Sequence, residues 1–164
     1  MNTSKPAGRT TVRPYIKRKL KIALYNLTTT TKLGGVETFV WELGRELAAR
    51  GHDVTIIGGR GPIRHNYAGV KVKTHRFISR EAWRRIPLLG RQYGLTKLLE
   101  RLSFAIFALP GLIRRRYDII HIQKPYDLPA GALTRWLSRA RLVFGCHGKD
   151  FWPGDRFFTR FVDT

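Results

Sequence analysis

The sequence predicts an α/β fold in which residues 21–150 form a doubly wound parallel sheet. Short apolar runs, typical of buried strands, alternate along the chain with longer segments whose apolar residues recur at helical spacing. Glycines mark several of the junctions between them. Strands that alternate with helices join through right-handed crossovers, which makes the sheet parallel. The length of 164 residues suits one domain that buries a core of its own.

The first strand is expected over residues 22–27, where an apolar run ends in four threonines and a glycine-containing loop. The next segment has helical spacing from residue 36 onward, with Glu37 in the first turn and Gly51 where a C′ glycine belongs. Residues 53–57 then read as a second strand. This order predicts a strand–helix–strand unit at the start of the domain.

The second half of the domain follows the same alternation. Residues 70–75 alternate apolar and polar side chains, which predicts a strand near the edge of the sheet. Residues 77–93 are irregular and combine arginines with aromatic and aliphatic side chains. Beyond them we expect a helix over 95–109, a strand over 119–123, a helix over 127–138 and a strand over 141–146.

The charge is strongly positive and unevenly distributed. The chain has 31 Lys and Arg against 11 Asp and Glu, a net charge of +20. Residues 1–21 hold seven basic and no acidic side chains, and residues 60–116 hold 14 basic and two acidic ones. Because residues 1–20 lack apolar periodicity, they are expected to form a disordered basic arm. Such a field attracts nucleic acid, anionic membrane surfaces or phosphorylated substrates.

Several classes of protein are disfavoured by what the sequence lacks. With Cys146 as the only cysteine, a disulfide framework and a Cys-ligated zinc site are excluded, and a reducing, cytoplasmic setting is favoured. No metal site is expected, because the sequence has no Asp-x-Asp pair and no histidine pair at ligand spacing. Phosphate-binding G-x-G-x-x-G and P-loop motifs and the G-x-S-x-G elbow are also missing. A secretory signal is not expected, and an apolar stretch of about 20 residues does not occur.

Two loops at the expected carboxyl edge of the sheet are candidate binding sites. Gly34 and Gly35 precede the first helix, where glycine lets free backbone amides approach a phosphate. A tight turn that simply requires glycine explains them equally well. The second loop starts at His147, which could donate to a substrate hydroxyl or take a proton, or could be held by the backbone alone. His121, on a central strand, is interpreted as a packed residue.

Five segments in this order resemble the N-terminal half of glycosyltransferase family 4 over about residues 21–150. They are Lys21-Ile22-Ala23-Leu24, Gly34-Gly35-Val36-Glu37, Leu47 to Val54, Tyr117-Asp118-Ile119-Ile120-His121 and His147-Gly148-Lys149-Asp150. The resemblance implies one Rossmann-like half of a GT-B enzyme. Such enzymes transfer an activated sugar with retention of configuration, and need neither a metal nor another cofactor.

The resemblance also implies roles for particular residues. Gly34 and Gly35 would lie against the donor diphosphate, and His147 matches the histidine that contacts the donor sugar near the reaction centre. Lys149 and Asp150 would orient substrate. Many relatives have a second histidine where this chain has Gln123.

The expected function is that of the acceptor-side domain, acting on a lipid-linked or envelope polysaccharide acceptor. Residues 77–93 would contact the anionic cytoplasmic face of a membrane. The family's C-terminal donor domain is not in this sequence, so residues 151–164 would begin a truncated interdomain region, or a separate chain would supply that domain. Either way the chain alone is expected to be inactive. The alternative is a basic nucleic-acid-binding module, which the charge favours and the absence of a recognition motif disfavours.

Overall fold

Five parallel strands form one sheet in the computed structural model, which describes residues 18–63 and 65–147. The strand order is β3-β2-β1-β4-β5, and every neighbouring pair is parallel. The strands are β1 (Lys21–Tyr25), β2 (Asp53–Gly59), β3 (Val70–His75), β4 (Ile119–Ile122) and β5 (Arg141–Phe144). The sheet thus winds outward from β1 in both directions, which confirms the predicted doubly wound topology and the edge position of β3.

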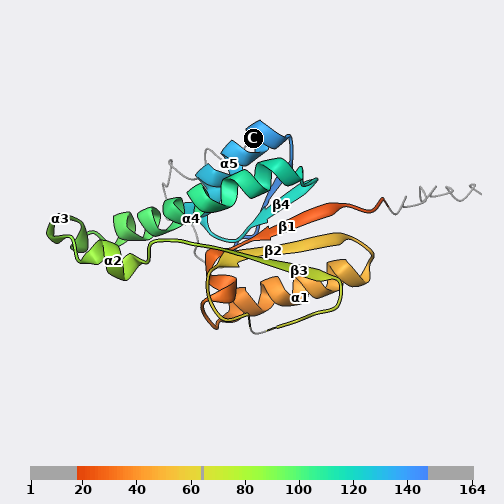
Figure 1. The fold of residues 1–164 in the computed structure, drawn as a ribbon, viewed down its shortest axis with the longest axis horizontal. Helices are drawn as coiled ribbons and strands as arrows, with labels where there is room; N and C mark the ends of the chain where they lie inside the picture. Colours follow the sequence, from red (N-terminus) through yellow and green to blue (C-terminus); the bar gives the residue numbers. More distant parts are fainter. Residues whose placement is uncertain (1–17, 64, 148–164) are drawn as a thin grey trace, which may run out of the picture.

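Helices cover both faces of the sheet. Helix α1 (Gly35–Ala49) lies on one face, and α4 (Tyr93–Arg115) and α5 (Leu128–Ser138) lie on the other (Figure 1). Short 3₁₀ turns, η1 (Leu27–Thr30) and η2 (Pro125–Asp127), follow β1 and precede α5. Because the strands are parallel, the loops after β1, β4 and β5 lie at one edge of the sheet.

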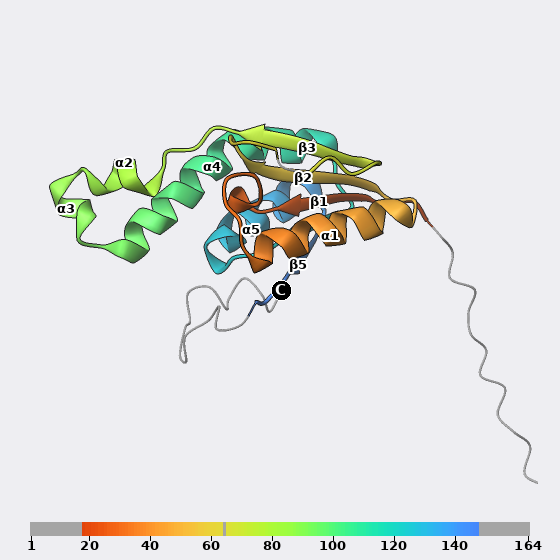
Figure 2. The same ribbon diagram turned by 90° about the horizontal axis from the view of Figure 1, so that it is seen from below.

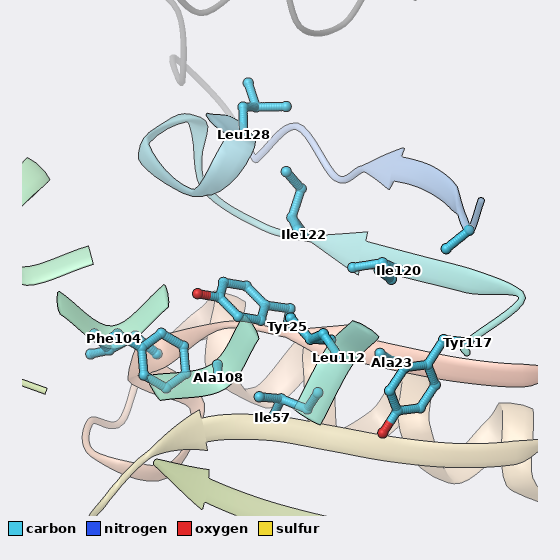
Figure 3. Packing of buried hydrophobic residues seen from close by; sticks show 12 residues of the cluster. Ala23, Tyr25, Ile57, Phe104, Ala108, Leu112, Tyr117, Ile120, Ile122 and Leu128 are labelled. Atoms are coloured by element: carbon cyan, nitrogen blue, oxygen red, sulfur yellow. The ribbon is translucent and has the colours of Figure 1, made fainter. Parts of the chain in front are cut away.

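Alternation along β1 explains the two hydrophobic clusters of the core. Ile22 and Leu24 face α1, where they pack with Val40 and Trp41. Tyr25 faces α4, and its ring lies 5.0 Å from that of Phe104 between centroids (Figure 3). Because both faces of β1 are buried, its sequence is a continuous apolar run, as is typical of the centre of a parallel sheet.

The ends of the helices agree only partly with the expected ones. Gly51 has a φ of 88° directly after α1, which confirms the predicted C′ glycine. Helix α4 was expected to end at residue 109, but it continues through Pro110 to Arg115. Leu112, 2% exposed, packs into the core in this last part of the helix. The free energy gained by burying Leu112 offsets the cost of the backbone hydrogen bond that Pro110 removes.

Residues 77–93, expected to be irregular, contain two short helices, α2 (Arg80–Arg84) and α3 (Pro87–Gly90). Ser79 caps α2 by accepting a hydrogen bond from the amide of Ala82. Together with the first turn of α4 they project past the carboxyl ends of the strands (Figure 2), and we call residues 79–93 the lobe. Within the described part of the chain, no helix combines the length and the apolar character of a membrane span.

Candidate functional site

The candidate site lies at the carboxyl edge of the sheet, where the chain leaves β1 and β4 in different directions. Helix α1, which follows β1, covers one face, whereas α5, which follows β4, covers the other. Loops therefore diverge between β1 and β4, and in open α/β sheets ligands bind at this point. Helix α1 begins at this edge, and residues 145–147, which follow β5, also lie there.

Gly34 and Gly35 lie at the start of α1, and their backbone angles alone do not require glycine. Gly34 has an extended φ of 173°, and Gly35 is the first helical residue, so neither adopts the left-handed conformation that favours glycine. A Cβ built on Gly35 meets no atom within 4 Å. A Cβ on Gly34 would lie 2.5 Å from Oε2 of Glu37, so glycine is needed there for space, whereas the open space beside Gly35 leaves its backbone accessible to a ligand.

His147 lies at the same edge, beside two polar residues of β4 and the loop after it. Its Nε2 is 2.6 Å from Oε1 of Gln123, a side chain that is fully buried. With Oε1 as the acceptor, Nε2 is the donor in this hydrogen bond. The histidine is thus held by a buried side chain rather than by the backbone alone.

Gly145 lets these side chains approach one another. A Cβ at this position would lie 2.7 Å from Oε1 of Gln123, 3.0 Å from Nε2 of His121 and 3.2 Å from Nε2 of His147. The three polar side chains therefore converge on one backbone position that has no side chain of its own. We call His121, Gln123 and His147 the histidine cluster.

Phe39 of α1 connects this cluster to the start of the helix. Its ring centroid is 4.9 Å from that of His147 and 6.5 Å from that of His121, both in edge-on arrangements. Burial lowers the pKa of His121, and the neighbouring His147 lowers it further. His121 is therefore neutral at physiological pH and offers one donor and one acceptor nitrogen.

A buried polar network lies behind the site. Arg101 of α4 donates to Oδ2 of Asp127 at 2.7 Å and to Oδ1 of Asn26 at 3.3 Å, and all three side chains are nearly inaccessible. Burial raises the pKa of Asp127, and the charge of Arg101 opposes that shift. The network ties the end of β1 and the start of α5 to α4, which fixes the strand ends that carry the site.

The structure brings together some of the residues expected at the site. Gly34, Gly35 and His147 share one edge, whereas Lys149 and Asp150 lie outside the described residues. His121, interpreted as a packed residue, is half-buried and lies against Phe39 beside His147. The i, i+2 spacing of His121 and Gln123, which puts both on one face of the strand, was the available signal. Among residues 18–63 and 65–147, no group of His, Cys, Asp and Glu could hold a metal ion.

Comparison with known proteins agrees with this architecture. The catalytic domain of starch synthase IV from Arabidopsis thaliana, bound to ADP and acarbose, matches the chain with a TM-score of 0.58 and 19% sequence identity. The match covers 79% of this chain and 34% of that one, so the chain spans about a third of the length of the matched structure. No curated protein matches the sequence at a significant level.

The sequence itself matches a family profile. The profile described as Glycosyltransferase Family 4 covers residues 33–163, most of the chain. The described part of this region contains the start of α1, the histidine cluster and the edge of the sheet on which both lie. With its Rossmann-like sheet as one half of a GT-B fold, the chain belongs to Glycosyltransferase Family 4.

Proposed function

We propose that this chain is the acceptor-side domain of a retaining glycosyltransferase that uses a nucleotide-sugar donor. The observation that carries the proposal is the pairing of His147 with the open start of α1 at one edge of the sheet. The amides at the start of a helix suit a diphosphate, and an imidazole held by a buried amide suits a sugar hydroxyl. The family assignment supports the same reaction class.

The proposed reaction breaks one bond, forms one bond and transfers one proton. The bond between the anomeric carbon and the diphosphate oxygen breaks, and the acceptor oxygen bonds to that carbon on the same face. The acceptor proton passes to the departing phosphate. The backbone at Gly34 and Gly35 binds the diphosphate, His147 contacts the sugar, and Lys149 and Asp150 orient substrate. This route requires no metal ion and no enzymic nucleophile.

Most of the donor contacts belong, in this proposal, to a second domain. The match covers only 34% of the starch synthase domain, and GT-B enzymes bind the donor between two Rossmann-like halves. The donor-binding half would be carried by a longer native polypeptide or by a separate chain. The 164-residue chain alone is then expected to show no sugar transfer.

We further propose that the acceptor is lipid-linked or part of an envelope polysaccharide, at the cytoplasmic face of a membrane. The lobe exposes arginines beside apolar side chains, including Ile86 at 44% and Tyr93 at 60% exposure. Such a surface suits anionic headgroups. It extends from the same edge as the candidate site (Figure 2).

The test is a transfer assay in which the chain is combined with its donor-binding domain. His147→Ala should lower turnover by about 10²–10⁴-fold, as expected for the loss of a positioned catalytic group. The matched control is His65→Ala, a histidine that packs against Tyr67 and against Trp41 of α1. Near-normal turnover of His147→Ala, or equal losses in both variants, would contradict the proposal. A chelator should leave the rate unchanged.

A further inference from the structure

An open groove lies at the amino-terminal edge of the sheet, opposite the candidate site. It consists of two adjoining hollows of about 490 and 470 Å³ that share Arg116, Ser138 and Arg139. The carboxyl ends of α4 and α5 meet the starts of β1, β4 and β5 there. The four-residue strand β4 alone separates the two edges by about 13 Å.

Arginines from separate elements line this groove. They come from the end of α4, the end of α5 and the starts of β1 and β5: Arg18, Arg114, Arg116, Arg139 and Arg141. Asp118 is the one acid among the lining residues. Its carboxylate accepts the backbone amide of Lys21 at 2.8 Å and lies 3.8 Å from Arg18. We call the groove lined by these five arginines the arginine groove.

The other four arginines of the groove have no carboxylate partner in the described part of the chain. Like charges that converge in a concave surface repel one another, and low-dielectric walls strengthen the field between them. Arg114 and its neighbour Arg115 already contribute, after burial, to the lowered pKa of Lys73. A bound anion would relieve this repulsion.

The backbone conformation at two of these arginines supports the same interpretation. Arg116 and Arg139 have φ values of 48° and 60°, and they are the non-glycine residues with positive φ in the described part of the chain. Each follows the end of a helix, where glycine or asparagine would adopt this conformation at lower cost. Arginine at both positions therefore costs stability, which indicates that its side chain serves another purpose.

Helix dipoles explain only part of the arrangement. A cation near the carboxyl end of a helix is favourable, which accounts for the sign of charge at Arg114, Arg116 and Arg139. It does not account for Arg18 and Arg141, which lie at the starts of strands. Nor does it account for the hollow between them.

We propose that the arginine groove binds the phosphate groups of a compact anionic ligand, away from the transferase site. The guanidinium group is a planar fork that pairs with two phosphate oxygens, and several such groups converge here on one hollow. The hollows have the volume of sites for small molecules or headgroups. Tyr117, the aromatic residue in the lining, is 5% exposed, so the groove lacks the accessible rings on which nucleic-acid bases stack. The proposal does not depend on the proposed transferase function.

Titration of the full chain with tripolyphosphate, followed by amide NMR shifts and calorimetry, tests the proposal. Arg116→Asn with Arg139→Asn removes two charges and keeps residues that tolerate positive φ. This variant should bind at least tenfold more weakly. The control, Arg45→Gln with Arg50→Gln, removes the same charge from two exposed positions, one on α1 and one directly after it, and should bind within twofold of the wild type. Arg114→Gln with Arg141→Gln is a second groove variant that leaves both positive-φ positions untouched.

Equal weakening by the groove and control variants would overturn the proposal, because the net charge alone would then explain binding. Preferential binding of a single-stranded RNA oligonucleotide, with shifts spread beyond the groove, would also overturn it. Vesicles of phosphatidylglycerol and of phosphatidylcholine distinguish the sources of phosphate. If tripolyphosphate displaces the chain from the anionic vesicles and the groove variant weakens their binding, the ligand is a lipid headgroup. If tripolyphosphate alone binds the groove, the ligand is a soluble phosphate compound.

Discussion

Replacing glycine by alanine should have opposite effects on stability at Gly145 and Gly35. The comparison distinguishes a glycine needed for packing from one needed for ligand binding. In Gly145→Ala the new Cβ would displace the histidine cluster, because buried Gln123 cannot move away. Overpacking of this kind costs about 1–3 kcal/mol. The measurements are the free energy of unfolding in urea and the imidazole NMR signals of His121 and His147, which should both change.

Gly35→Ala is the contrasting case at the start of α1. Alanine fits there without contact and favours the helix by up to about 1 kcal/mol, so the unfolding free energy should rise or stay constant. Transfer by the enzyme combined with its donor domain should nevertheless fall, because the methyl group occupies the proposed diphosphate position. Unchanged transfer would leave Gly35 with no role in binding.

The stability of the fold should depend on pH through two half-buried histidines. Burial is the main cause that lowers the pKa of both His121 and His75 from 6.5. As the pH falls below about 6.5, the two imidazoles bind protons in the unfolded chain but not in the folded chain. The free energy of unfolding therefore decreases until the folded pKa values are reached. Urea unfolding between pH 7.5 and 5 should show this loss, and His121→Gln with His75→Gln should flatten it. An equally steep loss in the double variant would assign it to other groups.

At the level of elements, the Arg101–Asp127 pair should hold α4 to the start of α5. Arg101→Met leaves a buried carboxylate without its cation and should cost about 3–5 kcal/mol in unfolding free energy. Arg101→Met with Asp127→Leu removes both charges and should recover most of that loss. If the double variant is as unstable as the single one, packing of the long side chain, and not charge, is what Arg101 contributes.

The elements themselves were largely predictable, because each depends on local periodicity. The apolar run at β1 and the helical spacing of α1 gave their positions within a few residues. The buried threonines after β1 were not foreseen. Thr30 packs where a Cβ on Gly58 would lie, and donates to the carbonyl oxygen of Gly59. Such a contact joins segments that are about 30 residues apart, and no local pattern reports it.

Only part of the candidate site could be predicted from local sequence patterns. Gly35 and His147 lie in loops that follow strands, and the rule for parallel sheets places those loops at one edge. The bond between Gln123 and His147 depends on the register between β4 and β5, in which His121 pairs with Val143. The Asn26–Arg101–Asp127 network joins three distant segments. Both required the packed structure.

For the whole molecule, the positive charge is divided between the two ends of the sheet. The lobe extends beyond the carboxyl ends of the strands (Figure 1). The arginine groove lies at their amino-terminal ends. Within the lobe, Arg80 is held by Tyr93 and Glu81, whereas Arg84, Arg85 and Arg91 are exposed. A membrane that contacts the lobe would therefore lie at the end of the molecule that carries the candidate site.

This arrangement predicts that the lobe, rather than the N-terminal basic segment, attaches the chain to anionic membranes. Each Arg near such a surface contributes about 1 kcal/mol, so the three exposed arginines supply several kcal/mol before Ile86 inserts. The chain should sediment with phosphatidylglycerol vesicles but not with phosphatidylcholine vesicles, and high salt should weaken the binding. Arg84→Glu with Arg85→Glu and Ile86→Ser should reduce sedimentation more than deletion of residues 1–17. Trp83 is left unchanged because it is half-buried. If the deletion abolishes binding and the triple variant binds normally, the attachment belongs to the N-terminal segment, and the lobe is an ordinary charged surface.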